Sequence, residues 1–207
     1  MEVFLIRHGE CEANRDRMAL GNTPLTPLGI EQAKNLQNII PQSFDKIYTS
    51  NLIRAEMTAR YAFGLNKTDS RVLIENDLRE IDLGEQLEGL HADEIQLTKD
   101  EMRKWTYQLE DTMKGKYDTE PLDHFIKRTG DAFSKIVDKS LNDGDHCIFI
   151  FSHGGTMRSI LSHRIGVIGN DGLKFWNTEI IRLKLNNGKW ELLERRDDHI
   201  IGRDIKG

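Results

Sequence analysis

The sequence predicts an α/β protein, a three-layer sandwich in which a mainly parallel sheet carries helices on both faces. One observation is that short apolar segments without polar alternation, typical of strands buried on both faces, alternate with longer segments of helical periodicity. A second is that Asn186-Asn187-Gly188 separates two strand-like segments, which predicts a hairpin that closes one side of the sheet. Alternating strands and helices are typical of this fold class.

The length and the charge of the chain limit the classes of protein to consider. With 207 residues it can bury one sizeable core, so we expect a single domain over residues 1–207. The net charge of -5 argues against a general nucleic-acid binder, and no apolar segment is long enough to span a membrane. Cys11 and Cys147 belong to no paired spacing, so neither a zinc site nor a disulfide framework is expected. The chain enters its first strand without room for a signal segment, and a cytoplasmic location is the default expectation.

The first strand ends in two residues suited to phosphoryl chemistry. Residues 3–6 form an apolar run that Gly9 breaks, so the strand presents Arg7 and His8 at its end. An arginine offers a planar fork of donors that matches a phosphate, and a neutral imidazole can attack the phosphorus that the arginine has oriented. The pair therefore indicates a phosphate site.

The next elements predict a helix start that favours anions. A helix over residues 27–40, with Thr26 as its N-cap, is followed by a strand over residues 46–50. Asn51 then opens a helix that carries Arg54 in its first turn. Because the N-terminal end of a helix has unpaired N–H groups, Arg54 adds positive charge where an anion can use it.

The middle of the chain predicts a lid. A strand over residues 72–74 leads into a loop that carries Glu80, and the pattern then changes. Residues 85–118 are charged and helical in tendency, so we expect them to form a helical lid insertion. A long helix begins at Pro121, and its predicted buried face consists of Phe125, Thr129, Ala132, Phe133, Ile136 and Val137.

A second histidine follows the clearest buried strand. Residues 147–151 are apolar and lead through Ser152 to His153, which two glycines and a helix follow. Such a histidine can lie beside backbone N–H groups. The hairpin strands, residues 180–185 and 189–194, complete the sheet. Because ligands of such sheets bind beyond the carboxyl ends of the strands, we expect one site formed by Arg7, His8, Arg54, Glu80 and His153.

Several motifs occur in order along nearly the whole chain: LIRHGE, PLTPLGIEQA, YTSNLIRAEMTA, LREIDLGEQLEG, FSHGGTMRS and the late Asn177-Thr178. Together they resemble the histidine phosphatase superfamily, which includes cofactor-dependent phosphoglycerate mutases and many small phosphatases. The resemblance implies a phosphatase that hydrolyses phosphate monoesters through a phosphohistidine intermediate, a histidine acid phosphatase-like phosphomonoesterase. It implies a small-molecule substrate, no metal and no cofactor.

The resemblance also implies a role for each site residue. His8 would be phosphorylated, and Arg7, Arg54 and His153 would form the phosphate pocket, with Asn14 at its rim and Gly154 at its edge. Glu80 would donate the proton to the leaving group, with Asp77 and Asp82 as the neighbouring alternatives. For its attack His8 must be neutral, so one ring nitrogen should keep its proton by bonding a carbonyl while the other faces phosphorus.

The sequence departs from the family pattern in ways that leave alternatives open. Leu87 stands where tryptophan is frequent, and Cys11 stands where serine or threonine is usual. The lid lacks an adjacent arginine pair and has seven acidic residues against five basic ones over residues 91–118, which favours a phosphatase over a mutase. A non-catalytic phospholigand-binding module is a third possibility. Cys11 and Arg17 match the spacing of cysteine-dependent phosphatases, but the loop between them has no glycine to cradle phosphate.

The remaining histidines and the lid aromatics have mainly structural interpretations. We expect structural roles for His91, His124, His146, His163 and His199. Trp105, Tyr107 and Met113 fit a lid core better than a substrate pocket. A sugar phosphate, a nucleotide-derived phosphate and a phosphoprotein all fit the predicted chemistry, and the sequence leaves the oligomeric state open.

Overall fold

The computed structural model describes residues 1–19, 21–168 and 174–201. They form a six-stranded sheet in the order β3-β2-β4-β1-β5-β6. The strands are β1 Glu2–Arg7, β2 Lys46–Thr49, β3 Val72–Ile74, β4 Cys147–Ser152, β5 Ile180–Asn186 and β6 Lys189–Arg196. The pairs β1/β4, β2/β4 and β2/β3 are parallel, whereas β5 runs antiparallel to β1 and β6. The predicted mainly parallel sheet with a closing hairpin is therefore confirmed.

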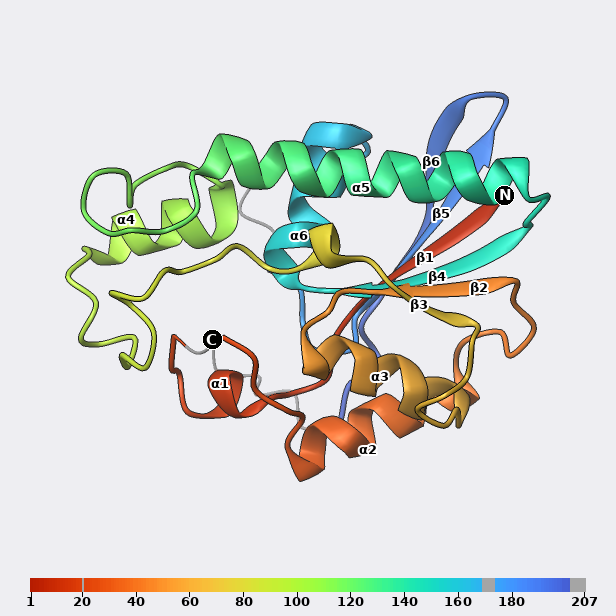
Figure 1. Cartoon of the computed structure of the whole chain (residues 1–207), viewed down its shortest axis with the longest axis horizontal. Coiled ribbons are helices and arrows are strands. Elements are labelled where there is room, and N and C mark those ends of the chain that lie inside the picture. Colours follow the sequence, from red (N-terminus) through yellow and green to blue (C-terminus); the bar gives the residue numbers. More distant parts are fainter. Residues whose placement is uncertain (20, 169–173, 202–207) are drawn as a thin grey trace.

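Helices cover both faces of this sheet, as Figure 1 shows. Helices α2 (Pro27–Asn35) and α3 (Ile53–Phe63) lie on one face, and α5 (Leu122–Asn142) and α6 (Gly154–Ser159) lie on the other. Successive residues of a strand point to opposite faces, and β1 follows this rule. Val3 and Leu5 belong to the core under α5, whereas Phe4 and Ile6 belong to the core under α3. The three-layer architecture that the sequence predicts is confirmed.

Short helices complete the described part of the chain. They are α1 Glu12–Arg15, η1 Leu36–Asn38, η2 Asn76–Leu78, α4 Lys99–Arg103, η3 Lys104–Gln108 and η4 Ile160–Arg164. Among the described helices, none combines the length and the apolar character that crossing a membrane requires.

Helix α2 starts as predicted and ends earlier. The Thr26 hydroxyl accepts a hydrogen bond from the Gly29 N–H at 3.0 Å, so it caps the helix. The predicted end at residue 40 is wrong, because the α-helix stops at Asn35 and tightens into η1. A residue that precedes proline is disfavoured in helical conformation, and Pro41 therefore makes residue 40 a poor helix end.

Helix α3 starts two residues after the predicted Asn51. Leu52 occupies the N-cap position, and its N–H donates to the Ser50 hydroxyl at 3.3 Å. The Asn22 side chain accepts from the Ile53 N–H at 2.7 Å. Two side chains from outside the helix thus satisfy its first N–H groups, a partnership that local sequence does not reveal.

The helical lid over residues 85–118 is largely a wrong prediction. Within this segment only α4 and η3 are helical, and the remainder consists of turns and loops. Gly89 and Gly115 adopt positive φ angles, and Leu109 ends η3 in a left-handed conformation. The apolar residues instead serve a small separate core of loops, in which Leu87 is fully buried. That core satisfies the hydrophobic pattern without a continuous helix.

Candidate active site

Strand register brings the two predicted histidines together. Arg7 pairs with Ser152 across the parallel strands β1 and β4. Each strand ends there, so the next residues, His8 and His153, leave the sheet side by side. Their ring centroids are 5.0 Å apart. His153 is also the N-cap residue of α6, which places it at a helix start.

His8 is held as a neutral nucleophile. Its Nδ1–H donates to the Gly9 carbonyl at 2.7 Å, which leaves the lone pair on Nε2. Arg54 Nε donates to that Nε2 at 3.3 Å. Burial first, and then the charges of Arg54 and Arg7, hold the pKa of His8 well below the ordinary value of an imidazole. The ring is therefore unprotonated at Nε2 near neutral pH.

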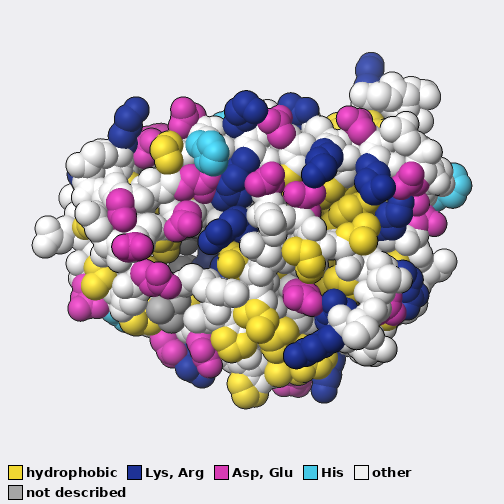
Figure 2. All heavy atoms as spheres, in the orientation of Figure 1, with side chains coloured by type: hydrophobic (Ala, Val, Ile, Leu, Met, Phe, Trp, Pro, Cys, Tyr) yellow, Lys and Arg dark blue, Asp and Glu magenta, His cyan; other side chains and the backbone are white. Residues whose placement is uncertain are grey.

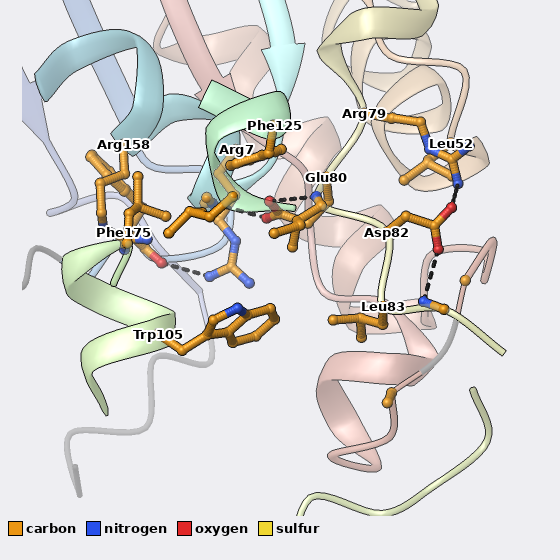
Figure 3. A pocket seen from close by; sticks show the side chains of 18 of the residues that line it. Arg7, Leu52, Arg79, Glu80, Asp82, Leu83, Trp105, Phe125, Arg158 and Phe175 are labelled. Carbon is orange, nitrogen blue, oxygen red and sulfur yellow. Dashed lines mark hydrogen bonds and ion pairs between the residues drawn. The ribbon is translucent and has the colours of Figure 1, made fainter. Parts of the chain in front are cut away.

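Two arginines bring positive charge to the same place. Arg54 lies in the first turn of α3, and its Nη1 donates to the Gly21 carbonyl at 2.6 Å. Arg7 Nη1 donates to the Phe175 carbonyl at 2.6 Å. Figure 3 shows the Arg7 guanidinium pointing into the pocket between Phe175 and Glu80, with Trp105 across from it. Fixed guanidinium groups suit an oxyanion, because they need no reorganisation when charge develops.

His153 is fully buried, and its two ring nitrogens have different surroundings. Nε2 lies 2.7 Å from the Ser50 hydroxyl. Nδ1 is buried and has no hydrogen-bond partner within the described residues. Burial, followed by the charge of Arg54, lowers the pKa of His153 well below its ordinary value. His153 is therefore a neutral imidazole next to His8.

Glu80 is the carboxylate that the fold fixes beside the start of α6. One of its oxygens accepts from the Gly155 N–H at 2.9 Å, and the other accepts from the Ile81 N–H at 3.1 Å. Of its alternatives, Asp82 also lines the pocket, but it accepts from the Gly84 N–H at 3.0 Å and lies 3.6 Å from Arg79. Asp77 is not among the lining residues. Glu80 therefore has the better position of the three.

The predicted rim residues lie where the nucleophile loop meets the turn before β5. Asn177 Nδ2 donates to the Asn14 side chain at 3.1 Å and to the His8 carbonyl at 3.0 Å. Thr178 N donates to the carbonyls of Arg7 at 3.0 Å and His8 at 3.3 Å. Asn14 is thus linked to the nucleophile through Asn177, to which the sequence motifs assigned no function. In the sequence, Asn177 was marked only as part of the polar pair Asn177-Thr178 before the strand predicted over residues 180–185.

A cavity of about 350 Å³ opens at this edge of the sheet. Arg7, Arg54, Glu80 and Gly154 line it, whereas the histidines lie beneath the surface with 3% exposure for His8 and 0% for His153. On the face drawn in Figure 2, Lys and Arg side chains gather below α5 beside a hollow in the surface. The structure thus brings together all the predicted site residues, with Asn14 connected from the rim.

The cavity also has walls that the sequence did not assign to the site. The apolar walls are Trp105, Leu109, Phe125 and Phe175, and the cationic walls are Arg79, Arg158 and Lys174. Trp105 lines the cavity and also packs against the small loop core that contains Met113, as the sequence predicted. The side chain of Tyr107 lies outside the described residues. Arg158 lies on the short helix that His153 caps, and this closeness to His153 in the sequence was the one indication that Arg158 belongs to the site.

Cys11 lies outside the cavity lining, although it is near enough to interact electrostatically with Arg54. Cys11 is buried and Arg17 is exposed, with its Nη2 at 3.0 Å from Asp93, and neither residue lines the cavity. This contradicts a cysteine-phosphatase loop. The five histidines expected to be structural do not line the cavity either. Across residues 1–19, 21–168 and 174–201, no group of three or more His, Cys, Asp or Glu side chains is placed to hold a metal ion.

Comparison with known proteins identifies the family and the fold of this chain. The sequence pattern of the histidine phosphatase superfamily (branch 1) matches residues 3–198. The adenosylcobalamin/alpha-ribazole phosphatase of Escherichia coli (strain K12) is 32% identical over 178 residues, which is 81% of this chain and 80% of that protein. A broad-specificity phosphatase of Saccharomyces cerevisiae is 27% identical and covers 78% of this chain and 69% of its own. The crystal structure of phosphoglycerate mutase from Bacillus anthracis shares the fold, with a TM-score of 0.80 at 20% identity over 96% of this chain and 93% of the other.

Proposed function

Because the chain belongs to the histidine phosphatase superfamily, we propose that it hydrolyses phosphate monoesters through a phosphohistidine on His8. The family match and the phosphatase names of its relatives confirm the family and the class of activity that the motifs predict. The assignment of roles to individual residues is our proposal.

One observation carries the proposal for His8. The Gly9 carbonyl takes the proton-bearing Nδ1, so the Nε2 lone pair faces Arg54. A phosphate oxygen bound by Arg54 would replace Nε2 as the acceptor of this hydrogen bond, and the lone pair would then be free beside the bound phosphate. His8 Nε2 is then placed to form a bond to phosphorus.

The reaction proceeds in two displacements at phosphorus. His8 Nε2 forms a bond to phosphorus as the bond to the ester oxygen breaks, and Glu80 gives its proton to the departing oxygen. Arg7, Arg54 and His153 stabilise the charge on the equatorial oxygens. Water then attacks the phosphohistidine while Glu80 takes one of its protons, which releases phosphate and regenerates both groups.

The pocket favours one second candidate, a phosphotransfer isomerase of the mutase type. Arg79, Arg158 and Lys174 line the cavity in addition to the two site arginines, so a second anionic group of a substrate would find positive charge there. These three cations could bind a second phosphate in place of the adjacent arginine pair, whose absence from residues 85–118 argued against a mutase. A binding module without turnover is the third candidate, since the same pocket would hold a phosphorylated ligand.

Incubation with a panel of phosphorylated compounds separates these candidates. The panel contains sugar phosphates, nucleotide-derived phosphates, phosphoglycerates and, because of the name of the Escherichia coli relative, alpha-ribazole phosphate. We expect free phosphate from at least one of them. Isomerised product without free phosphate would favour the mutase, and neither product would favour the binding module.

Two variants test the nucleophile in the same assay. His8→Ala should abolish phosphate release, because alanine has no nitrogen that can form the bond to phosphorus. Cys11→Ser should leave it nearly unchanged, since Cys11 does not line the cavity. The opposite pattern would assign the chemistry to the cysteine.

Several finer features belong to the same proposal. We propose that residues 1–207 act as one domain and that the enzyme is a histidine acid phosphatase-like phosphomonoesterase of the cytoplasm. We also propose a small-molecule substrate rather than a nucleic acid, in keeping with the net charge of -5.

A further inference from the structure

Ser50 is a buried residue whose hydroxyl contacts the site histidine His153. It follows β2 directly and is 0% exposed. Its Oγ lies 2.7 Å from His153 Nε2 and accepts from the Leu52 N–H at 3.3 Å. The backbone N–H of Ser50 donates to the Phe151 carbonyl at 3.2 Å, which fixes the serine against the strand that carries His153.

We infer that Ser50 is a positioning residue that holds His153 in the Nδ1–H tautomer, so that the single N–H of this ring points at the phosphate. The inference rests on the proposed function for the identity of the anion. It assigns a role to a residue that does not line the cavity and reaches the substrate through His153 alone.

The number of hydrogen bonds that the Ser50 hydroxyl can donate and accept favours the Nδ1–H tautomer of His153. A hydroxyl has one proton and two lone pairs. One lone pair accepts from Leu52, and Nε2 of His153 is the second partner. If Nε2 carried the proton, the Ser50 hydroxyl would accept twice and its own proton would have no acceptor within the described residues. If the hydroxyl donates to Nε2, every group is satisfied and the ring proton lies on Nδ1.

The other ring nitrogen supports the same choice. His153 Nδ1 is buried without a partner in the described part of the chain, and the ring lies 5.0 Å from that of His8. A buried donor without an acceptor is costly, and an oxygen of a phosphate held by Arg54 and Arg7 would accept from it. A bare Nδ1 lone pair would instead repel that oxygen.

The neutrality of His153 makes the position of its proton decisive. Burial and the nearby arginines lower the pKa of His153 well below its ordinary value, so the ring carries one proton. A protonated imidazolium would donate from both nitrogens, and the serine would then not matter. With one proton to place, the hydrogen bond at Nε2 decides whether Nδ1 is a donor or an acceptor.

Ser50→Ala should therefore weaken phosphate binding by about 10- to 100-fold, by analogy with the loss seen when a residue that orients a metal-ligating histidine is removed. Ser50→Thr keeps the hydroxyl and should restore most of the affinity. Ser140→Ala is the matched control, because Ser140 is equally buried and its hydroxyl contacts Tyr48 at 3.3 Å rather than a site residue. It should bind phosphate as the unmodified protein does.

Nitrogen-15 NMR of the histidine rings reads the tautomer directly, with His153 assigned from a His153→Asn sample. We expect a protonated Nδ1 and an unprotonated Nε2 in the unmodified protein, and loss of this fixed pattern in Ser50→Ala. Calorimetry with inorganic phosphate measures the affinity of each variant, and thermal unfolding shows that each is folded. If Ser50→Ala does not fold, the spectrum of the unmodified protein still decides the tautomer.

The outcomes separate this inference from the proposed function. An Nε2–H tautomer in the unmodified protein would overturn the inference whatever the activity, and so would unchanged phosphate affinity in a folded Ser50→Ala. An unmodified protein that hydrolyses no phosphate ester would contradict the proposed function, while the NMR result would still decide the role of Ser50.

Discussion

His8, His153 and Glu80 owe their chemical states to their immediate neighbours. Burial, and after it the charges of Arg54 and Arg7, lower the pKa of both rings and keep them neutral. A carbonyl and a hydroxyl decide which nitrogen of each ring carries the proton. Glu80 is fixed by two backbone N–H groups, one of them at the start of α6. At this scale the site is a set of hydrogen bonds that fixes the His8 ring, the His153 ring and the Glu80 side chain around one cavity edge.

The role of Glu80 as proton donor predicts a dependence on the leaving group. Glu80→Gln should slow hydrolysis of an alkyl phosphate at least about 100-fold, because an alkoxide needs a proton to depart. An aryl phosphate with a stable phenolate should lose much less. Steady-state rates on both substrates measure the contrast. Equal losses would mean that Glu80 only shapes the pocket, and Asp82 would then be the next proton donor to test.

Gly155 should be required for the position of Glu80. A Cβ atom at Gly155 would overlap the Glu80 carboxylate, so Gly155→Ala must displace it. We expect this variant to lose alkyl phosphate hydrolysis preferentially, as Glu80→Gln does. Gly154→Ala is the matched control, because its Cβ would lie 3.7 Å from Arg7 Nε in ordinary contact. Its ratio of alkyl to aryl rates should stay that of the unmodified enzyme, and a similar ratio for both alanine variants would contradict the argument.

At the scale of elements, strand register explains why distant segments form one site. Arg7 and Ser152 are partners in the sheet, and Thr49 pairs with Phe151 on the other side of β4. His8 and His153, which follow the first pair, therefore emerge at the same level, and Ser50 lies one residue earlier, level with Ser152. The alternation of strands and helices was enough to predict this edge, because parallel strands end together.

The same scale shows where sequence reasoning failed. The lid was expected to be helical, yet Leu87 and Met113 pack in a core made mostly of loops. Helical spacing of apolar residues cannot distinguish a helix from loops that bury the same side chains. The role of Ser50 was missed for a related reason, since a hydroxyl at a strand end gains its function only from a partner 103 residues away.

Gly29 should be essential for docking α2 against the nucleophile loop. A Cβ atom there would overlap the Glu10 carbonyl, and both sides of the contact are backbone. We expect Gly29→Ala to lower the free energy of unfolding by about 1–3 kcal/mol, measured by urea titration. Gly130→Ala, in the interior of α5, meets only the flexible Arg164 side chain at 3.4 Å and should be neutral or stabilising by up to about 1 kcal/mol. Equal effects would show that the contact does not limit stability.

For the whole molecule, two buried neutral histidines couple stability to pH. The folded pKa of each lies below its ordinary value of about 6.5, so below that pH the unfolded chain binds protons that the folded chain does not. Stability should therefore fall as the pH decreases from about 6.5, by up to about 1.4 kcal/mol per pH unit for each histidine. His8→Asn should make this fall shallower in urea titrations between pH 5 and 7. A fall as steep as that of the unmodified protein would contradict the contribution of His8.

The central claim for the molecule is that phosphate passes through His8, and trapping the intermediate tests it most directly. The enzyme is mixed with the phosphate ester that it hydrolyses, quenched in alkali within milliseconds, digested and mapped by mass spectrometry. We expect a phosphate on the peptide that contains His8, and its absence, together with loss of turnover, in His8→Ala. Phosphate on another residue, or turnover that survives in His8→Ala, would contradict the account.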